Sequence, residues 1–162
     1  MRFFEIFAIA IVLISISFFS YCENRKKYFL LFIISLFTVS AGEFINMKNS
    51  TTIYNNSFFM FPGTKLPLFI IPLGAIISVW TFFFTERIAK FFKKNYFQFF
   101  FLFLVSVFFP FLSELIGVKM GIWKWNVRFE LSFFFLLGIW KFYFIFIFSP
   151  VLLFSLFSIR KN

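Results

Sequence analysis

The chain has 162 residues, of which 62% are hydrophobic and 36 are phenylalanine, and its formal net charge at pH 7 is +10. It contains no histidine, its only cysteine is Cys22, and its six acidic side chains are all glutamates. This composition excludes histidine-based iron and zinc sites, aspartate-rich magnesium sites and a disulfide within the chain. We therefore expect neither a metal nor a cofactor.

Apolar segments long enough to cross a hydrocarbon core of ~30 Å recur along the sequence. They predict an all-α polytopic membrane protein with a single integral membrane domain, residues 1–162. The five predicted transmembrane helices are approximately 3–22, 28–47, 66–85, 97–117 and 131–158. The first follows Arg2 and lacks a small-x-small cleavage site, so we interpret it as a span and not as a signal peptide. The last contains Lys141 and Pro150, and an interfacial piece followed by a span is the alternative.

The positive charges lie mainly in the predicted loops, where cations that flank spans set orientation and meet anionic lipid. We therefore expect membrane lipids as partners and no nucleic acid. The side with more cations has Arg25, Lys26, Lys27, Arg87, Lys90, Lys93, Lys94, Arg160 and Lys161. The other side has Arg2, Lys48, Lys65, Lys119, Lys124, Arg128 and Lys141. The positive-inside rule places the first set in the cytoplasm, which predicts N-out/C-in in the cytoplasmic membrane of a prokaryote.

The second predicted span and its loop, residues 29–55, align without a gap over residues 100–126 after a shift of 71 positions. The polar or charged identities are Ser35 with Ser106, Glu43 with Glu114, Lys48 with Lys119 and Asn55 with Asn126. An internal duplication would give parallel repeats whose loops emerge on the same, non-cytoplasmic side. Coincidence between two apolar helices that end in polar loops is the alternative.

Glu43 and Glu114 are the carboxylates of this repeat. Helical spacing places Ser35, Gly42 and Asn46 on the same face as Glu43, and small or weakly polar residues suit close packing around a polar pocket. An ionisable group inside a span is a functional hypothesis by default, because exposure to lipid is costly. The alternative is a structural glutamate near a helix end.

Prolines and aromatic residues mark the loops that follow. Pro67 and Pro72 open the third segment, either as helix punctuation or as a kink beside a cavity. The aromatic side chains are Tyr54, Trp123 and Trp125. They are either anchors at headgroup level or ring faces that stabilise a cation.

Taken together, these features resemble membrane proteins of carotenoid biosynthesis, including the bisanhydrobacterioruberin-type carotenoid hydratases. The likeness rests on Glu43 at the end of a span, Tyr54 in the next loop, "PLFIIPLGA" at 67–75, Glu114, and "GIWKW" at 121–125. A small membrane lycopene-cyclase domain is similar in its acidic residue and G-x-W element, but its proline-plus-paired-glutamate motif is absent here.

The resemblance implies an enzyme that adds water to a polyene or isoprenoid end group, or cyclises it, by carboxyl general acid catalysis. Glu114 would be the acid and Glu43 the base for water. Trp123, Trp125 and Tyr54 would face the cation, and a final pair of side chains would orient water, namely Asn55 and Asn126. A homodimer or a biosynthetic partner protein would help to enclose a long substrate. The alternative is a non-catalytic membrane protein for assembly, lipid binding or transport.

Overall fold

The computed structural model describes residues 2–48, 52–54, 59–89, 100, 104, 108, 112 and 115–125. These residues are mostly helical and form α1 (Arg2–Ser20), α2 (Arg25–Lys48), β1 (Thr52–Tyr54), α3 (Ile70–Ala89) and β2 (Trp123–Trp125). Residues 115–119 add a short helical segment. The predicted span 131–158 lies outside the described residues, and so does most of the predicted span 97–117.

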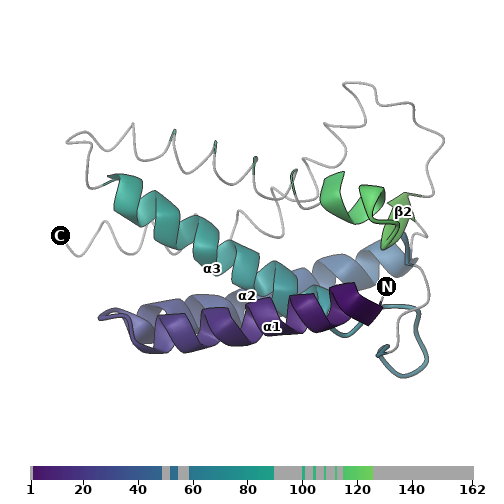
Figure 1. The fold of residues 1–162 in the computed structure, drawn as a ribbon, viewed down its shortest axis with the longest axis horizontal. Helices are drawn as coiled ribbons and strands as arrows, with labels where there is room; N and C mark the ends of the chain where they lie inside the picture. The colour runs from purple at the N-terminus through teal and green to yellow at the C-terminus, as the bar shows by residue number, and fades with distance from the viewer. Residues whose placement is uncertain are drawn as a thin grey trace.

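Two of the helices, α1 and α2, are long and apolar enough to cross a membrane by length and composition. They form an antiparallel pair joined by the turn at residues 21–24 (Figure 1). Asn24 ends this turn, and its carbonyl accepts the backbone N–H of Tyr28 at 3.2 Å, the first intrahelical bond of α2. Asparagine is among the preferred residues at this capping position, so the local sequence sets the start of α2.

Helix α3 begins at Ile70, later than the predicted residue 66. Pro67 forms an isolated β-bridge with Met60, so the chain is still extended there. The residue before a proline avoids the helical region, and the helix starts only after the following turn. Pro72 then lies in the first turn, where its missing N–H leaves no intrahelical bond unmade. The apolar part of α3, Ile70–Phe84, is shorter than the first two helices.

Helix α3 packs most extensively against α2. A Cβ atom on Gly74 would lie 2.9 Å from Cγ1 of Val39, so the absence of a side chain at Gly74 lets the two backbones approach closely. Close approach through small residues is the usual way in which apolar helices associate without a hydrophobic driving force.

The three helices bury polar side chains and expose apolar ones. Glu5 and Ser15 on α1, Ser35 on α2, and Ser78 and Thr81 on α3 are all buried. The exposed side of α1, by contrast, includes the large apolar side chains Phe3, Ile6, Phe7, Leu13 and Ile14. This distribution reverses the usual pattern of a protein surrounded by water.

The buried apolar residues form two clusters, one toward each end of the helices. The cluster near the end of α2 joins Ala8, Val39, Tyr54, Leu66, Phe69, Ile70, Ile71, Ile122 and Trp123. The cluster near the start of α2 joins Phe19, Tyr28, Leu31, Val79 and Phe82. Each cluster contains one tyrosine whose hydroxyl binds a glutamate, as described below.

Candidate functional site

The first polar centre lies where α2 ends and joins Glu43 to Tyr54. The hydroxyl of Tyr54, on β1, donates a hydrogen bond to Oε2 of Glu43, on α2. Tyr54 is buried and Glu43 is half-buried. An ionised carboxylate accepts hydrogen bonds and cannot donate them, so this arrangement suits a proton acceptor. Two of the residues singled out from the sequence are therefore in direct contact.

Trp123 reaches this centre through a local backbone motif. Helical segment 115–119 is followed by a turn in which Gly121 has a positive φ of 65°. The N–H of Ile122 bonds to the Gly117 carbonyl at 2.9 Å, and the N–H of Gly121 bonds to the Val118 carbonyl at 3.0 Å. This bond pair is the Schellman motif, which reverses the chain at a helix end and requires a residue that tolerates positive φ. The motif turns Trp123 back onto its own helix.

The Trp123 indole packs between two partners. A Cβ on Gly117 would lie only 2.1 Å from Cζ2 of Trp123, so the ring lies directly against the glycine backbone. The Tyr54 ring is the other partner, with ring centroids 6.2 Å apart and an interplanar angle of 65°. Edge-to-face pairs of this kind add ~0.5–1.5 kcal/mol beyond their area burial. Trp123 thus links segment 115–125 to the α2–β1 unit.

Strands β1 and β2 pair antiparallel, with Thr52 opposite Trp125, Ile53 opposite Lys124 and Tyr54 opposite Trp123. Ile53 is therefore paired with the residue that the 71-position shift assigns to it. The same shift carries β1 onto β2, and it carries the last residue of α2, Lys48, onto the last residue of helical segment 115–119. These element ends and the central strand pair are separated by the spacing found in the sequence.

The remaining sequence-predicted site residues divide into two groups. Trp125 lies in β2, and its backbone pairs with Thr52. Three residues lie outside the described part of the chain, namely Glu114, Asn55 and Asn126. The structure therefore brings together Glu43, Tyr54 and Trp123, with the backbone of Trp125 beside them.

Glu5 is a buried carboxylate that the sequence analysis did not include among the site residues. It is 4% exposed and lies on the buried stripe of α1 with Ala8, Val12 and Ser15. Ala8 belongs to the same cluster as Tyr54 and Trp123, so Glu5 lies one helical turn from that cluster. The available signal was the spacing: Glu5 shares a helical face with small residues, as Glu43 does.

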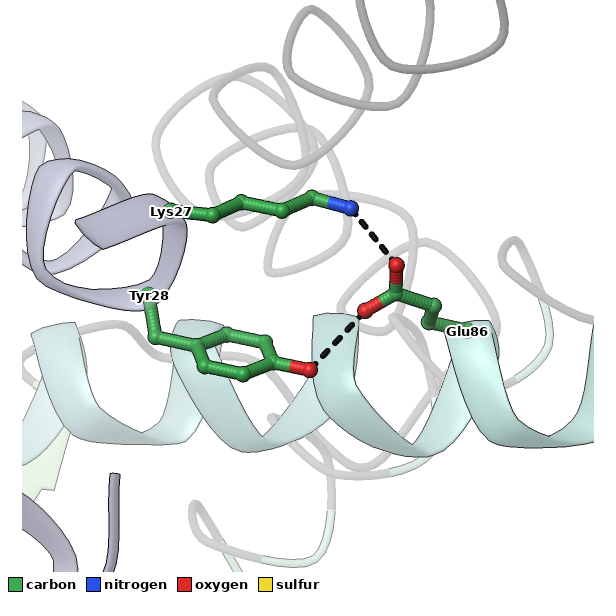
Figure 2. Close-up of polar contacts among 3 residues, drawn as sticks. All are labelled: Lys27, Tyr28 and Glu86. Atoms are coloured by element: carbon green, nitrogen blue, oxygen red, sulfur yellow. Dashed lines mark hydrogen bonds and ion pairs between the residues drawn. The ribbon is translucent and has the colours of Figure 1, made fainter. Parts of the chain in front are cut away.

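The second polar centre lies at the opposite end of the helices and joins Lys27, Tyr28 and Glu86 (Figure 2). Nζ of Lys27 is 2.6 Å from Oε1 of Glu86, and the Tyr28 hydroxyl donates to Oε2 of the same carboxylate at 2.9 Å. Both members of the ion pair are largely buried, with side chains 20% and 25% exposed. Each carboxylate oxygen of Glu86 has its own donor, so this centre ties the start of α2 to the end of α3.

Within the described ranges, no group of three His, Cys, Asp or Glu side chains could hold a metal ion. The chemical groups present at the first centre are a carboxylate, a phenol and an indole, and the carboxylate and phenol suit proton transfer. Comparison with known proteins adds no assignment: no family model, curated protein or solved structure matches this chain.

Proposed function

We propose that the chain is an integral membrane protein with five spans, N-out/C-in, in which α1 and α2 are the first two spans. The apolar exteriors and buried polar side chains of the three helices support this proposal. The described cations also divide by helix end. Arg25, Lys26, Lys27 and Arg87 lie at one end, and Lys48, at the end of α2, lies at the other. The four described members of the predicted cytoplasmic set thus lie at one end of the helices.

We further propose that residues 29–55 and 100–126 are parallel repeats related by a pseudo-two-fold axis. Such an axis along the membrane normal would keep the two helices parallel and would make the two equivalent strands antiparallel. It would also pass through a pair of equivalent residues, and Ile53 opposite Lys124 is such a pair. The register, the shared helix ends and the repeated glutamates support the duplication over coincidence.

The function that we propose is that of a membrane enzyme of carotenoid or isoprenoid biosynthesis, which hydrates or cyclises a polyene end group. The observation that carries this proposal is the Glu43 carboxylate, held by the Tyr54 hydroxyl beside the Trp123 indole, in a chain of apolar helices. The substrate would be lipophilic and would enter from the bilayer. A homodimer or partner protein would complete the enclosure of a long chain.

In the proposed hydration, both carboxyl groups return to their starting protonation states. The Glu114 carboxyl group gives its proton to one alkene carbon, and the neighbouring tertiary carbon becomes a cation that aromatic faces stabilise. Water, oriented by Asn55 and Asn126, adds its oxygen to the cation while Glu43 takes the released proton. Transfer of that proton back to Glu114 restores both groups. Cyclisation would use the same acid and aromatic faces, with loss of a proton in place of water addition.

The test is conversion of an acyclic carotenoid in a host that makes one, followed by mass-detected chromatography of the pigments. Hydration gives a gain of one water, and cyclisation gives an unchanged mass with altered absorption. We expect Glu43→Gln to lower conversion by at least ~100-fold, the usual scale for a general acid or base. Glu23→Gln, which changes an exposed carboxylate in the α1–α2 turn, should retain it.

The second candidate function is non-catalytic, with Glu43 and Tyr54 serving as a structural link. It is favoured by the burial of Tyr54 and Trp123, each 8% exposed, because their ring faces are covered by protein. An unchanged pigment in cells that contain the membrane-inserted protein would select this candidate. Loss of membrane-inserted protein with Glu43→Gln or Tyr54→Phe would support the same conclusion.

A further inference from the structure

A hollow lies far from Glu43, at the end of the helices where α2 begins. Its volume is about 300 Å³, and its walls come from α1, α2 and α3. The apolar part of the wall comprises Ile16, Phe19, Phe29, Phe32, Ile76 and Val79. This volume is at the lower end of the ~300–1,000 Å³ typical of ligand pockets, so it suits one hydrocarbon chain and not a bulky molecule.

Two exposed cations, Arg25 and Lys26, line the same hollow. They are the first two residues of α2, whose first turn contains no acidic residue. The N-terminus of a helix carries a partial positive charge, which cations at the same place increase. A negative group bound there is stabilised by the helix dipole and by the two side chains. The sequence thus concentrates positive charge where the backbone also favours an anion.

The neighbouring groups leave this charge available. Lys27 is committed to Glu86, and the Tyr28 hydroxyl is committed to the same carboxylate (Figure 2). Among the described residues, neither Arg25 nor Lys26 takes part in an ion pair. The hollow therefore combines an apolar wall with two cations, Arg25 and Lys26, that are not paired with Glu86.

We propose that this hollow binds an anionic phospholipid, with one acyl chain against the apolar wall and the headgroup phosphate against Arg25 and Lys26. The charge complementarity selects an anionic lipid over a zwitterionic one, because each surface cation attracts anionic headgroups. The exposure of the two cations, and of Phe29 at 63%, is consistent with a lipid that stands at the bilayer surface. The site is independent of the carboxylate chemistry proposed at Glu43.

The test is native mass spectrometry of the detergent-purified full chain with phosphatidylglycerol and phosphatidylcholine of identical acyl chains. We expect a preference for phosphatidylglycerol of about tenfold or more, in line with two surface cations. The double variant Arg25→Ala/Lys26→Ala should lose that preference. The matched control Lys48→Ala/Lys65→Ala removes two other exposed cations that do not line the hollow, and it should keep the preference.

A second measurement locates the acyl chain. Trp80 packs on Phe19, a wall residue, with ring centroids 4.9 Å apart. Phosphatidylglycerol with brominated acyl chains should therefore quench a part of the tryptophan fluorescence that Trp80→Phe removes. Equal loss of preference in both double variants would overturn the proposal in favour of general charge attraction. An absence of lipid preference, or quenching unaffected by Trp80→Phe, would also overturn it.

Discussion

At the scale of single residues, the first centre depends on two positions that a hydropathy profile does not distinguish from their neighbours. Gly121 supplies the positive φ that reverses the chain, and Gly117 supplies the bare backbone against which Trp123 packs. Both glycines act through what they lack, a side chain. The result is an indole fixed against the Tyr54 ring, next to a hydroxyl that binds Glu43.

Gly117→Ala separates two opposing effects. Alanine normally favours a helix over glycine by ~0.5–1 kcal/mol. Here its Cβ would lie 2.1 Å from Trp123, and overpacking of this kind costs ~1–3 kcal/mol. We expect net destabilisation in denaturant unfolding of the purified protein, together with a shift in tryptophan emission.

The double variant Gly117→Ala/Trp123→Phe provides the control for this prediction. Phenylalanine lacks the indole atoms Cζ2 and Cη2 that would meet the new Cβ. In the Trp123→Phe background we therefore expect alanine at position 117 to be neutral or stabilising. Additive effects of the two substitutions would contradict the contact between them.

At the scale of secondary structure elements, the polar contacts fix the helix packing at both ends. Tyr54 and Glu43 join β1 to α2, whereas Lys27, Tyr28 and Glu86 join α2 to α3. The single carboxylate of Glu86 accepts from two donors, so its loss affects both contacts at once. Loss of the Tyr28 hydroxyl removes one of these bonds, whereas Lys27 also places its Nζ over the Phe82 ring, 4.6 Å from the centroid.

We expect Glu86→Gln to lower the free energy of unfolding by ~1.5–3 kcal/mol, the range for hydrogen bonds to charged groups. Tyr28→Phe should cost less than Glu86→Gln, because it removes one of the two donors, leaves the Lys27–Glu86 pair in place and keeps the ring in its cluster. Chemical unfolding in a fixed detergent measures both. Glu23→Gln, an exposed change in the adjacent turn, should stay within ~0.5 kcal/mol. Equal stability of all three variants would show that the contacts contribute nothing.

The helices could be predicted from the sequence, whereas the strands could not. Long apolar runs and Asn24 determine α1 and α2 with little help from distant residues. A strand of three residues is too short to show an alternation of apolar and polar side chains. The central pair, Ile53 with Lys124, joins positions 71 residues apart, so the strands are stabilised only by tertiary contact. The start of α3 was predicted too early, because the bridge between Pro67 and Met60 keeps the chain extended there.

The candidate site also contains residues that could be predicted from the sequence and one that was missed. Glu43 and Tyr54 were identified in the repeated pattern of glutamate, loop and aromatic residue, and Trp123 in the "GIWKW" element, and the structure brings these three together. Glu5 was not, because it lies near the end of the predicted span 3–22 and outside the repeat. Its burial follows from the packing of α1 against the other helices, and the local signal for it is the face that Glu5 shares with Ala8 and Ser15.

At the scale of the whole molecule, the proposed repeat constrains topology. The antiparallel pairing of β1 with β2 places the ends of α2 and of helical segment 115–119 beside one sheet. Lys48 and Lys119 end these helices, and the 71-position shift relates them. Parallel repeats therefore require both lysines to lie on one side of the membrane, and the five-span orientation makes that side the outer one.

Site-directed labelling tests this requirement. In a Cys22→Ser background, we expect Lys48→Cys and Lys119→Cys to react with a membrane-impermeant maleimide added to intact cells. Glu23→Cys, in the α1–α2 turn at the opposite helix end, should react only after permeabilisation. All three native side chains are exposed, so differences in reactivity report the side of the membrane and not burial. Reaction of Lys48→Cys and Lys119→Cys from opposite sides would exclude parallel repeats. Reaction of both only after permeabilisation would keep the repeat and reverse the orientation, because the pseudo-two-fold relation fixes only that the two loops share a side.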